Sequence, residues 1–137
     1  MEYIKKFFSE SKFIIDHLDT EEINKAITCL LTIRKNHGRL FVLGVGGGAG
    51  HASHAVNDFR KIAGFEAYSP ADNVSELTAR INDDGWDTCF QRWLQGSRLH
   101  KNDGLLIFSV GGGDLKNQIS VNIVNSLKYA KEIGSMM

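Results

Sequence analysis

The chain has 137 residues, 42% hydrophobic and 23% charged, which suits one globular domain (1–137) with a buried core. Basic and acidic residues are equal at 16 each, so no bulk positive charge is available to bind nucleic acid or an anionic membrane. No run reaches the roughly 20 apolar residues of a membrane span, and the amino terminus lacks the apolar stretch of a secretory signal. We expect a cytoplasmic protein in which Cys29 and Cys89 are buried thiols.

Two amphipathic helices are predicted at the start of the chain. Apolar residues recur at helical spacing over 2–18, which gives this helix one apolar face in need of a partner. A second helix is predicted over 20–37, with Asp19 as a capping residue and Gly38 as a stop signal. The region 1–38 is therefore expected to be a helical pair.

The remainder, 39–137, alternates strands and helices and is expected to form an α/β core. Buried strands at 40–43 and 105–108 each lead into a glycine-rich loop and then a helix, so one structural device is repeated. This order predicts an open parallel sheet flanked by helices, with ligands at the carboxyl ends of the strands. The other predicted elements are a helix over 49–63, a weak strand over 65–69, two short helices within 73–98 around a turn at 82–85, and a long helix over 119–134.

The two glycine-rich loops are candidates for binding a phosphate. Consecutive glycines let the backbone approach a ligand and direct several N–H groups toward one point, and a following helix N-terminus adds partial positive charge. A tight turn that merely packs a helix on a sheet is the alternative, but two similar loops in one chain favour binding. The candidate residues are Gly46, Gly47, Gly48, Ser109, Gly111, Gly112 and Gly113.

The first loop also satisfies a dinucleotide-binding fingerprint. Residues 44–49 fit the pattern G-x-G-x-x-G/A, and Glu66 stands about 20 residues further on, where a ribose-binding carboxylate is expected. Two helices precede the first strand, however, and this hypothesis leaves the second loop unexplained. We keep a dinucleotide-binding domain as the remote alternative.

A candidate catalytic or metal-binding face follows the first loop. His51, His54 and Asp58 are spaced by three and four residues, which places them on one side of the predicted helix. Imidazole and carboxylate are typical zinc ligands, but zinc needs about three or four protein ligands, and one helix cannot supply them all. A solvated helix face with ordinary histidines is the alternative.

Residues 75–86 read S-E-L-T-A-R-I-N-D-D-G-W, with Phe90 beyond. This stretch resembles the S-x-L-T-A-x-x-N-D-x-G-aromatic signature of the phosphoheptose isomerase branch of the sugar isomerase (SIS) domain family. The resemblance extends from the first helix to Gly134. It implies a ketose–aldose isomerase that converts sedoheptulose 7-phosphate through an enediol-like intermediate, in heptose precursor synthesis for lipopolysaccharide or surface glycans, without an organic cofactor.

The resemblance also implies roles for particular residues. His54 matches the family's helix histidine, and Asp58 matches a catalytic, metal-ligating glutamate, so both become catalytic candidates and zinc ligands, with His51 a weaker ligand candidate. Asp83 matches a substrate-contacting aspartate, with Asn82 beside it. Family members are dimers and tetramers with active sites at subunit interfaces, so a homo-oligomer that binds a phosphorylated sugar is expected.

The chain departs from the family pattern in both loops. Where the first loop normally reads G-N-G-G-S, Val45 replaces the asparagine and Gly48 the serine, so backbone donors remain while a hydroxyl is lost. Where the second normally reads S-T-S-G-N-S, Ser109 is the one polar residue that persists, and Asp114 replaces the last serine. A carboxylate there would repel a phosphate, but Asp114 is interpreted first as a helix N-cap.

Two further departures bear on activity. Asp58 is one methylene shorter than the expected glutamate, enough to displace a catalytic base. Family members also continue with another strand and a helix carrying a glutamine and a catalytic histidine, whereas this sequence ends at Met137 as that strand would start. A non-catalytic, phosphosugar-binding module is therefore the main alternative to an isomerase.

Overall fold

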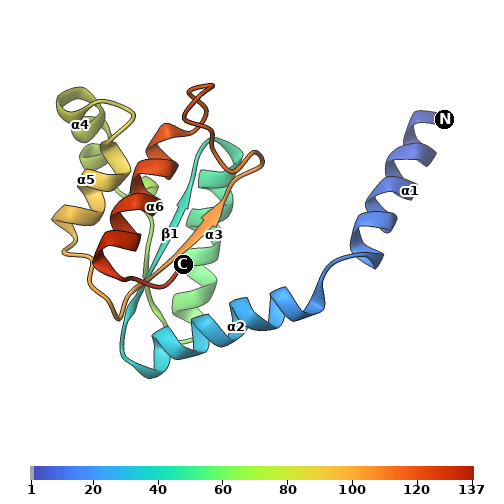
Figure 1. Cartoon of the computed structure of the whole chain (residues 1–137), viewed down its shortest axis with the longest axis horizontal. Helices are drawn as coiled ribbons and strands as arrows, with labels where there is room; N and C mark the ends of the chain where they lie inside the picture. Colours follow the sequence, from blue (N-terminus) through green and yellow to red (C-terminus); the bar gives the residue numbers. More distant parts are fainter. Residues whose placement is uncertain (1) are drawn as a thin grey trace.

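The computed structural model describes residues 2–137 and has an α/β architecture (Figure 1). Three parallel strands form the sheet: β1 (Arg39–Gly44) lies in the centre, β2 (Glu66–Tyr68) on one side and β3 (Gly104–Phe108) on the other. The predicted fold class, an open parallel sheet flanked by helices, is confirmed. Near the carboxyl end of the chain, Met136 forms a parallel bridge with Gly104 on the outer side of β3.

The helices occupy the predicted parts of the chain. Asp19 caps the second helix as expected, because its carboxylate accepts hydrogen bonds from the amides of Glu21 and Glu22. Cys89 is buried, and this burial raises the pKa of its thiol, whereas Cys29 is only half-buried. The helices are α1 (Glu2–Asp16), α2 (Thr20–Lys35), α3 (Gly47–Lys61), α4 (Val74–Asp84), α5 (Cys89–Gly96) and α6 (Val121–Ile133), with a short 3-10 turn at Pro70–Asp72.

Side chains of β1 alternate between two cores. Leu40 and Val42 pack with residues of α2 and α3 on one face of the sheet, whereas Phe41 and Leu43 pack with residues of α5 and α6 on the other. All four side chains are buried. The central strand is therefore covered on both faces, which explains why it reads as a continuous apolar run.

The first helix lies apart from this core. Figure 1 shows α1 extending away from the α/β body beyond the far end of α2, and no residue of α1 is buried. Phe8, Phe13 and Ile15 are each more than 60% exposed. The expected apolar face is thus present and uncovered within residues 2–137. None of the helices in that range is long and apolar enough to cross a membrane.

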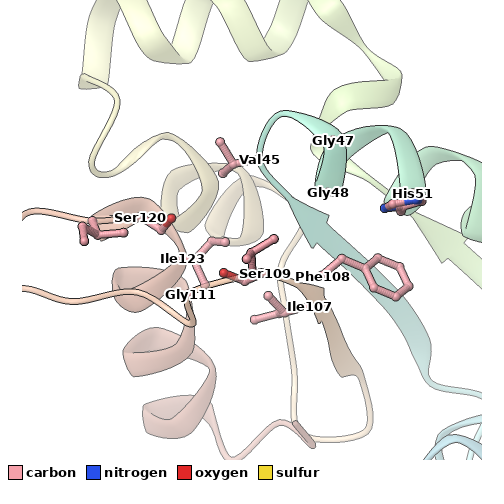
Figure 2. A pocket seen from close by; sticks show the side chains of 12 residues that line it. Val45, Gly47, Gly48, His51, Ile107, Phe108, Ser109, Gly111, Ser120 and Ile123 are labelled. Carbon is pink, nitrogen blue, oxygen red and sulfur yellow. The ribbon is translucent and has the colours of Figure 1, made fainter. Parts of the chain in front are cut away.

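Close backbone packing explains why two positions in the first glycine-rich loop are occupied by glycine. Gly48 lies in the first turn of α3, next to the end of β3 (Figure 2), and a Cβ atom on Gly48 would lie 2.5 Å from the carbonyl oxygen of Phe108. A Cβ on Gly44 would collide with the carbonyl of Gly48. Gly47, by contrast, has open space around its Cα. Gly44 and Gly48 are therefore required by packing alone.

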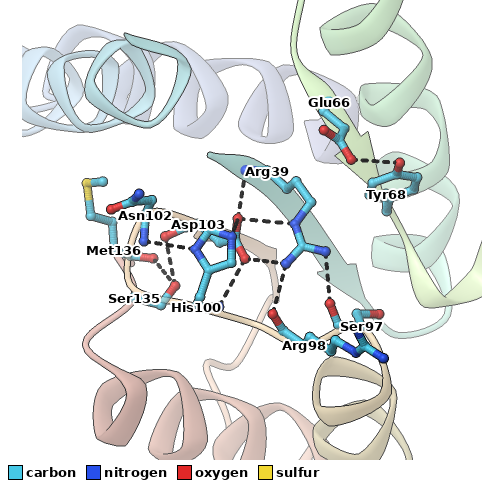
Figure 3. A network of polar contacts seen from close by, with 10 residues as sticks. All are labelled: Arg39, Glu66, Tyr68, Ser97, Arg98, His100, Asn102, Asp103, Ser135 and Met136. Atoms are coloured by element: carbon cyan, nitrogen blue, oxygen red, sulfur yellow. Dashed lines mark hydrogen bonds and ion pairs between the residues drawn. The ribbon is translucent and has the colours of Figure 1, made fainter. Parts of the chain in front are cut away.

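At the opposite end of the sheet, a buried ion pair ties three segments together (Figure 3). Asp103 is fully buried and accepts hydrogen bonds from the backbone amide of Arg39, from its guanidinium, at 2.7 Å for the closest nitrogen, and from the amide of His100. The carbonyl oxygen of Asp103 accepts from Ser135 and Met136. This network connects the start of β1, the segment before β3 and the carboxyl end of the chain.

Alanine substitutions at Gly48 and Gly47 compare a glycine that is closely packed with a neighbouring glycine that has open space around it. Gly48→Ala should lower the free energy of unfolding by about 1–3 kcal/mol, because its methyl group meets a backbone carbonyl that cannot rotate away. Gly47→Ala is the matched control and should change stability by less than about 1 kcal/mol. Urea unfolding of both variants measures the difference; equal stabilities would contradict the close approach of α3 to β3.

Loss of the buried carboxylate should be more damaging. Asp103→Ala leaves the Arg39 guanidinium, whose side chain is 21% exposed, without its partner. We expect a loss of about 3 kcal/mol, the lower end of the range for breaking a buried pair. Glu22→Ala removes the exposed Glu22–Lys25 pair and should cost no more than about 0.5 kcal/mol. Chemical denaturation that gave the same loss for both would show that the network does not stabilise the fold.

Candidate functional site

Both glycine-rich loops border one cavity of about 660 Å³ at the carboxyl ends of β1 and β3 (Figure 2). Gly47, Gly48 and His51 line it from the start of α3, and Ser109 and Gly111 line it from the second loop. The loops are brought together because β1 and β3 are adjacent and parallel. A phosphate site with donors from two loops requires that both loops border the same cavity, as they do here.

The first loop offers free backbone donors to this cavity. Gly46 has a φ of 56°, a left-handed conformation that favours glycine, and it turns the chain from β1 into α3. The amides of Gly48 and Ala49 bond to the carbonyls of Val45 and Gly46. The amides of Gly46 and Gly47 have no acceptor within residues 2–137, and of these two residues Gly47 lines the cavity whereas Gly46 does not. Free amides at a helix N-terminus suit an anion.

The second loop presents a similar set of donors. The hydroxyl oxygen of Ser109 accepts a hydrogen bond of 3.1 Å from the amide of Gly112, which closes the loop on itself. Gly112 and Gly113 both have positive φ values, 74° and 100°. In the described part of the chain, the amides of Val110, Gly111 and Gly113 have no acceptor. Val110 and Gly111 line the cavity, whereas the predicted site residues Gly112 and Gly113 do not. The loop therefore has unpaired N–H groups next to the first loop.

Asp114 does not cap the long helix, so that prediction is wrong. Its carboxylate accepts hydrogen bonds from the amides of Lys116 and Asn117, at 2.8 and 3.2 Å, and from the side-chain amide of Asn117. These bonds, above all the one from the Asn117 side chain, lower the pKa of Asp114. Asp114 anchors a separate turn that closes by paired backbone hydrogen bonds with Ile119. The carboxylate is engaged in this turn, and Asp114 is absent from the cavity lining.

The turn also breaks the literal repeat of strand, loop and helix. α6 begins at Val121, seven positions after Asp114, and Ile119 lies outside the helix and is half-exposed. The second loop thus does not run directly into a helix as the first one does. Asp114 and Ser120 are both acceptable N-caps by residue type, and the sequence did not show which of them begins the helix.

Ser120 is a site residue that sequence reasoning missed. It precedes α6, lines the cavity, and its hydroxyl makes no capping hydrogen bond. Its φ of 47° is unusual for a residue other than glycine. Its place immediately before an apolar helical run is the signal that could have identified it. A serine hydroxyl is therefore present at the cavity, although not at the expected position.

The candidate catalytic pair lies further along α3. His54 Nε2 is 3.3 Å from Asp58 Oδ2, but the His54 side chain is 79% exposed, and neither residue lines the cavity. Only His51 of the predicted face does, with its ring 6.2 Å from that of Phe108. Across residues 2–137 no three metal-ligating side chains cluster. His54 and Asp58 therefore supply two ligand atoms, fewer than zinc needs, so the described residues do not form a zinc site. We assign no catalytic step to a metal.

Two more predicted site residues lie away from the cavity. Asn82 and Asp83 are exposed in the last turn of α4, where the Asn82 side chain donates a 2.8 Å hydrogen bond to Asp83. Trp86, in the turn that follows, is also exposed and packs against Phe90. None of these residues contributes to the cavity wall.

The position of Glu66 contradicts the dinucleotide hypothesis. Glu66 is the first residue of β2 and lies opposite Arg39, the first residue of β1. The glycine loop begins at the other end of β1, five residues and therefore roughly 16 Å away. Glu66 accepts a hydrogen bond from the Tyr68 hydroxyl and cannot reach a ribose bound at the loop.

No family model matches the chain. It is 28% identical to phosphoheptose isomerase of Aliarcobacter butzleri, over 96% of the chain and 69% of that protein. It is 32% identical to phosphoheptose isomerase of Buchnera aphidicola, over 95% of the chain and 70% of the relative. The structure of phosphoheptose isomerase GmhA from Neisseria gonorrhoeae matches with a TM-score of 0.84 at 26% identity, over 98% of this chain and 70% of that one. This likeness, over nearly the whole chain, agrees with the shared cavity between the loops, and the chain belongs to the phosphoheptose isomerase family.

Proposed function

We propose that the chain is a sugar-phosphate isomerase that interconverts sedoheptulose 7-phosphate and a heptose 7-phosphate. The observation that carries this proposal is the convergence of two sets of free amides on one cavity, beside a helix face with an imidazole and a carboxylate. Family membership supplies the reaction class. The expected role, heptose supply for lipopolysaccharide or surface glycans in the cytoplasm, belongs to the same proposal.

The phosphate is assigned to the glycine loops. The amide of Gly47 would hold it from one side, and those of Val110 and Gly111, with the Ser109 and Ser120 hydroxyls, from the other. No lysine or arginine lines the cavity, so the anion is bound by neutral dipoles and the N-terminus of α3. The sugar then extends from the phosphate along α3 toward His54 and Asp58.

His54 and Asp58 are assigned to proton transfer. The Asp58 carboxylate would remove the proton from the carbon that bears a hydroxyl group, and His54 would donate a proton to the neighbouring carbonyl oxygen, giving the enediol-like intermediate. Return of the proton to the adjacent carbon completes the exchange of ketose and aldose. The 3.3 Å separation of the two side chains allows both to contact neighbouring substrate atoms.

The exposure of this pair supports assembly into a homo-oligomer, a dimer or tetramer, that would cover it. The uncovered apolar face of α1 offers a contact surface for a second copy. Zinc remains part of the proposal only if such an assembly supplies ligands beyond His54 and Asp58. Covering the pair would also remove water, which strengthens the electrostatic interactions that catalysis uses.

A phosphosugar-binding module without catalysis is the second candidate. It is favoured by the cavity lining, in which His51 is the one titratable side chain. The two candidates share the phosphate site and differ only at the catalytic pair. Binding without turnover distinguishes them.

The direct test is an isomerisation assay on sedoheptulose 7-phosphate, with and without zinc, combined with thermal denaturation in the presence of the sugar. We expect aldose formation and a rise in the melting temperature, because the ligand binds the folded state. A raised melting temperature without turnover would favour the binding module. No effect of the sugar in either measurement would refute both.

Variants of the catalytic pair test the assignment of roles. His54→Ala and Asp58→Ala should each lower kcat by about 10²–10⁴-fold, the usual contribution of a general acid or base. The melting-temperature shift caused by the sugar should persist, because the phosphate loops are unchanged. Lys61→Ala, an exposed change in the last turn of the same helix, is the control and should retain full activity. Unchanged turnover in the first two variants would refute the assignment.

A further inference from the structure

The segment from Asp114 to Ile119 forms a closed turn at the edge of the cavity. Backbone hydrogen bonds of 2.8 Å run in both directions between Asp114 and Ile119. Inside the turn, the Asp114 carboxylate holds the backbone of Lys116 and Asn117, and the Gln118 side chain donates to the carbonyl of Leu115. The turn is therefore stabilised mainly by its own polar groups.

This turn determines where the chain re-enters the cavity. Before the turn, Ser109 and Gly111 line the cavity, and the last residue of the turn, Ile119, and the next residue, Ser120, also line it. Gly113 lies close against this return, because a Cβ atom there would be 3.4 Å from the Ser120 carbonyl and 2.7 Å from Val124. Residues on both sides of the turn thus line the same cavity.

The backbone on both sides of the turn needs to be held in place. Gly112 and Gly113 before it, and Gln118 and Ser120 near its end, all have positive φ values. For residues other than glycine this conformation is strained and persists only when neighbouring contacts impose it. The hydrogen bonds of Asp114 are the contacts that fix the turn between them.

We propose that Asp114 is a positioning residue for the phosphate site: through the turn it holds the second glycine loop and Ser120 in the geometry that binds the anion. This role rests on the proposed function and adds to it a residue that does not itself touch the substrate. It reverses the expectation that the carboxylate at this position weakens phosphate binding. The charge is already paired with two backbone amides and the Asn117 side chain.

Three variants of the full chain test this role, with sedoheptulose 7-phosphate and inorganic phosphate as ligands in calorimetric titrations. Asp114→Ala removes every hydrogen bond of the carboxylate. Asp114→Asn keeps an oxygen acceptor for the Lys116 and Asn117 amides, both of which bond to the same atom, Oδ1. It removes the charge and the Oδ2 acceptor of the Asn117 side chain. Asp19→Ala is the matched control, because Asp19 Oδ1 accepts the same kind of backbone bonds, at 2.9 and 3.2 Å, far from the cavity at the start of α2.

We expect Asp114→Ala to bind both ligands about tenfold more weakly, because losing side-chain acceptors of this kind costs on the order of 1.4 kcal/mol, which corresponds to a factor of ten. Asp114→Asn should bind at least as tightly as the original chain. Asp19→Ala should lower the melting temperature without changing either affinity. Amide hydrogen exchange over residues 110–120 should accelerate in Asp114→Ala alone.

The outcomes separate the two proposals. If the original chain binds and Asp114→Ala binds equally well or more tightly, the positioning role is refuted while the proposed function stands. If Asp114→Asn is as weak as Asp114→Ala, the backbone hydrogen bonds to Oδ1 do not hold the loop, and the positioning role is also refuted. If the original chain binds neither ligand, the proposed function itself fails, and the positioning role fails with it.

Discussion

The close approach of α3 to the end of β3 is the constraint on which the site depends. Because Gly44 and Gly48 carry no side chain, the first turn of α3 can lie directly against the carbonyl of Phe108. This contact brings the N-terminus of α3 to the place where the second glycine loop begins. A larger residue at either position would separate the two loops and divide the cavity. Backbone packing and the proposed phosphate site thus both require glycine at positions 44 and 48.

The proposed phosphate-binding half of the site contains no positively charged side chain among the described residues that line the cavity. The chain has equal numbers of acidic and basic residues, and Arg39 is used elsewhere, in its pair with the buried Asp103. Neutral amide donors can approach an anion closely and need no counter-charge when the site is empty. Because these donors are fixed by the fold, little reorganisation accompanies binding. The positions of these amides must, however, be maintained by hydrogen bonds and packing within the loops.

The sequence predicted the architecture well, because apolar periodicity and glycine positions directly reflect burial and chain reversal. The two buried strands, the helix after the first loop and the short helices around Gly85 were all found from these patterns. It failed where two residues compete for one local role. Asp114 and Ser120 are both good N-caps, and the choice depends on a hydrogen-bonded turn that leaves no periodic signal. Likewise, Glu66 has the right spacing for a dinucleotide site, but strand register places it at the wrong end of the sheet.

The two halves of the proposed site differ in how completely this chain forms them. The phosphate half lies between loops that are fixed by adjacent strands, whereas His54 and Asp58 project from an exposed part of α3. In water, an exposed imidazole and carboxylate interact weakly, because the high dielectric screens their charges. Proton transfer by this pair would be faster if another protein surface covered the two side chains and excluded water. The uncovered apolar face of α1 is a surface through which a second copy could pack against this chain. Affinity for the phosphate and rate of isomerisation should therefore respond to different features: the first to the loops of a single chain, the second to whatever covers α3.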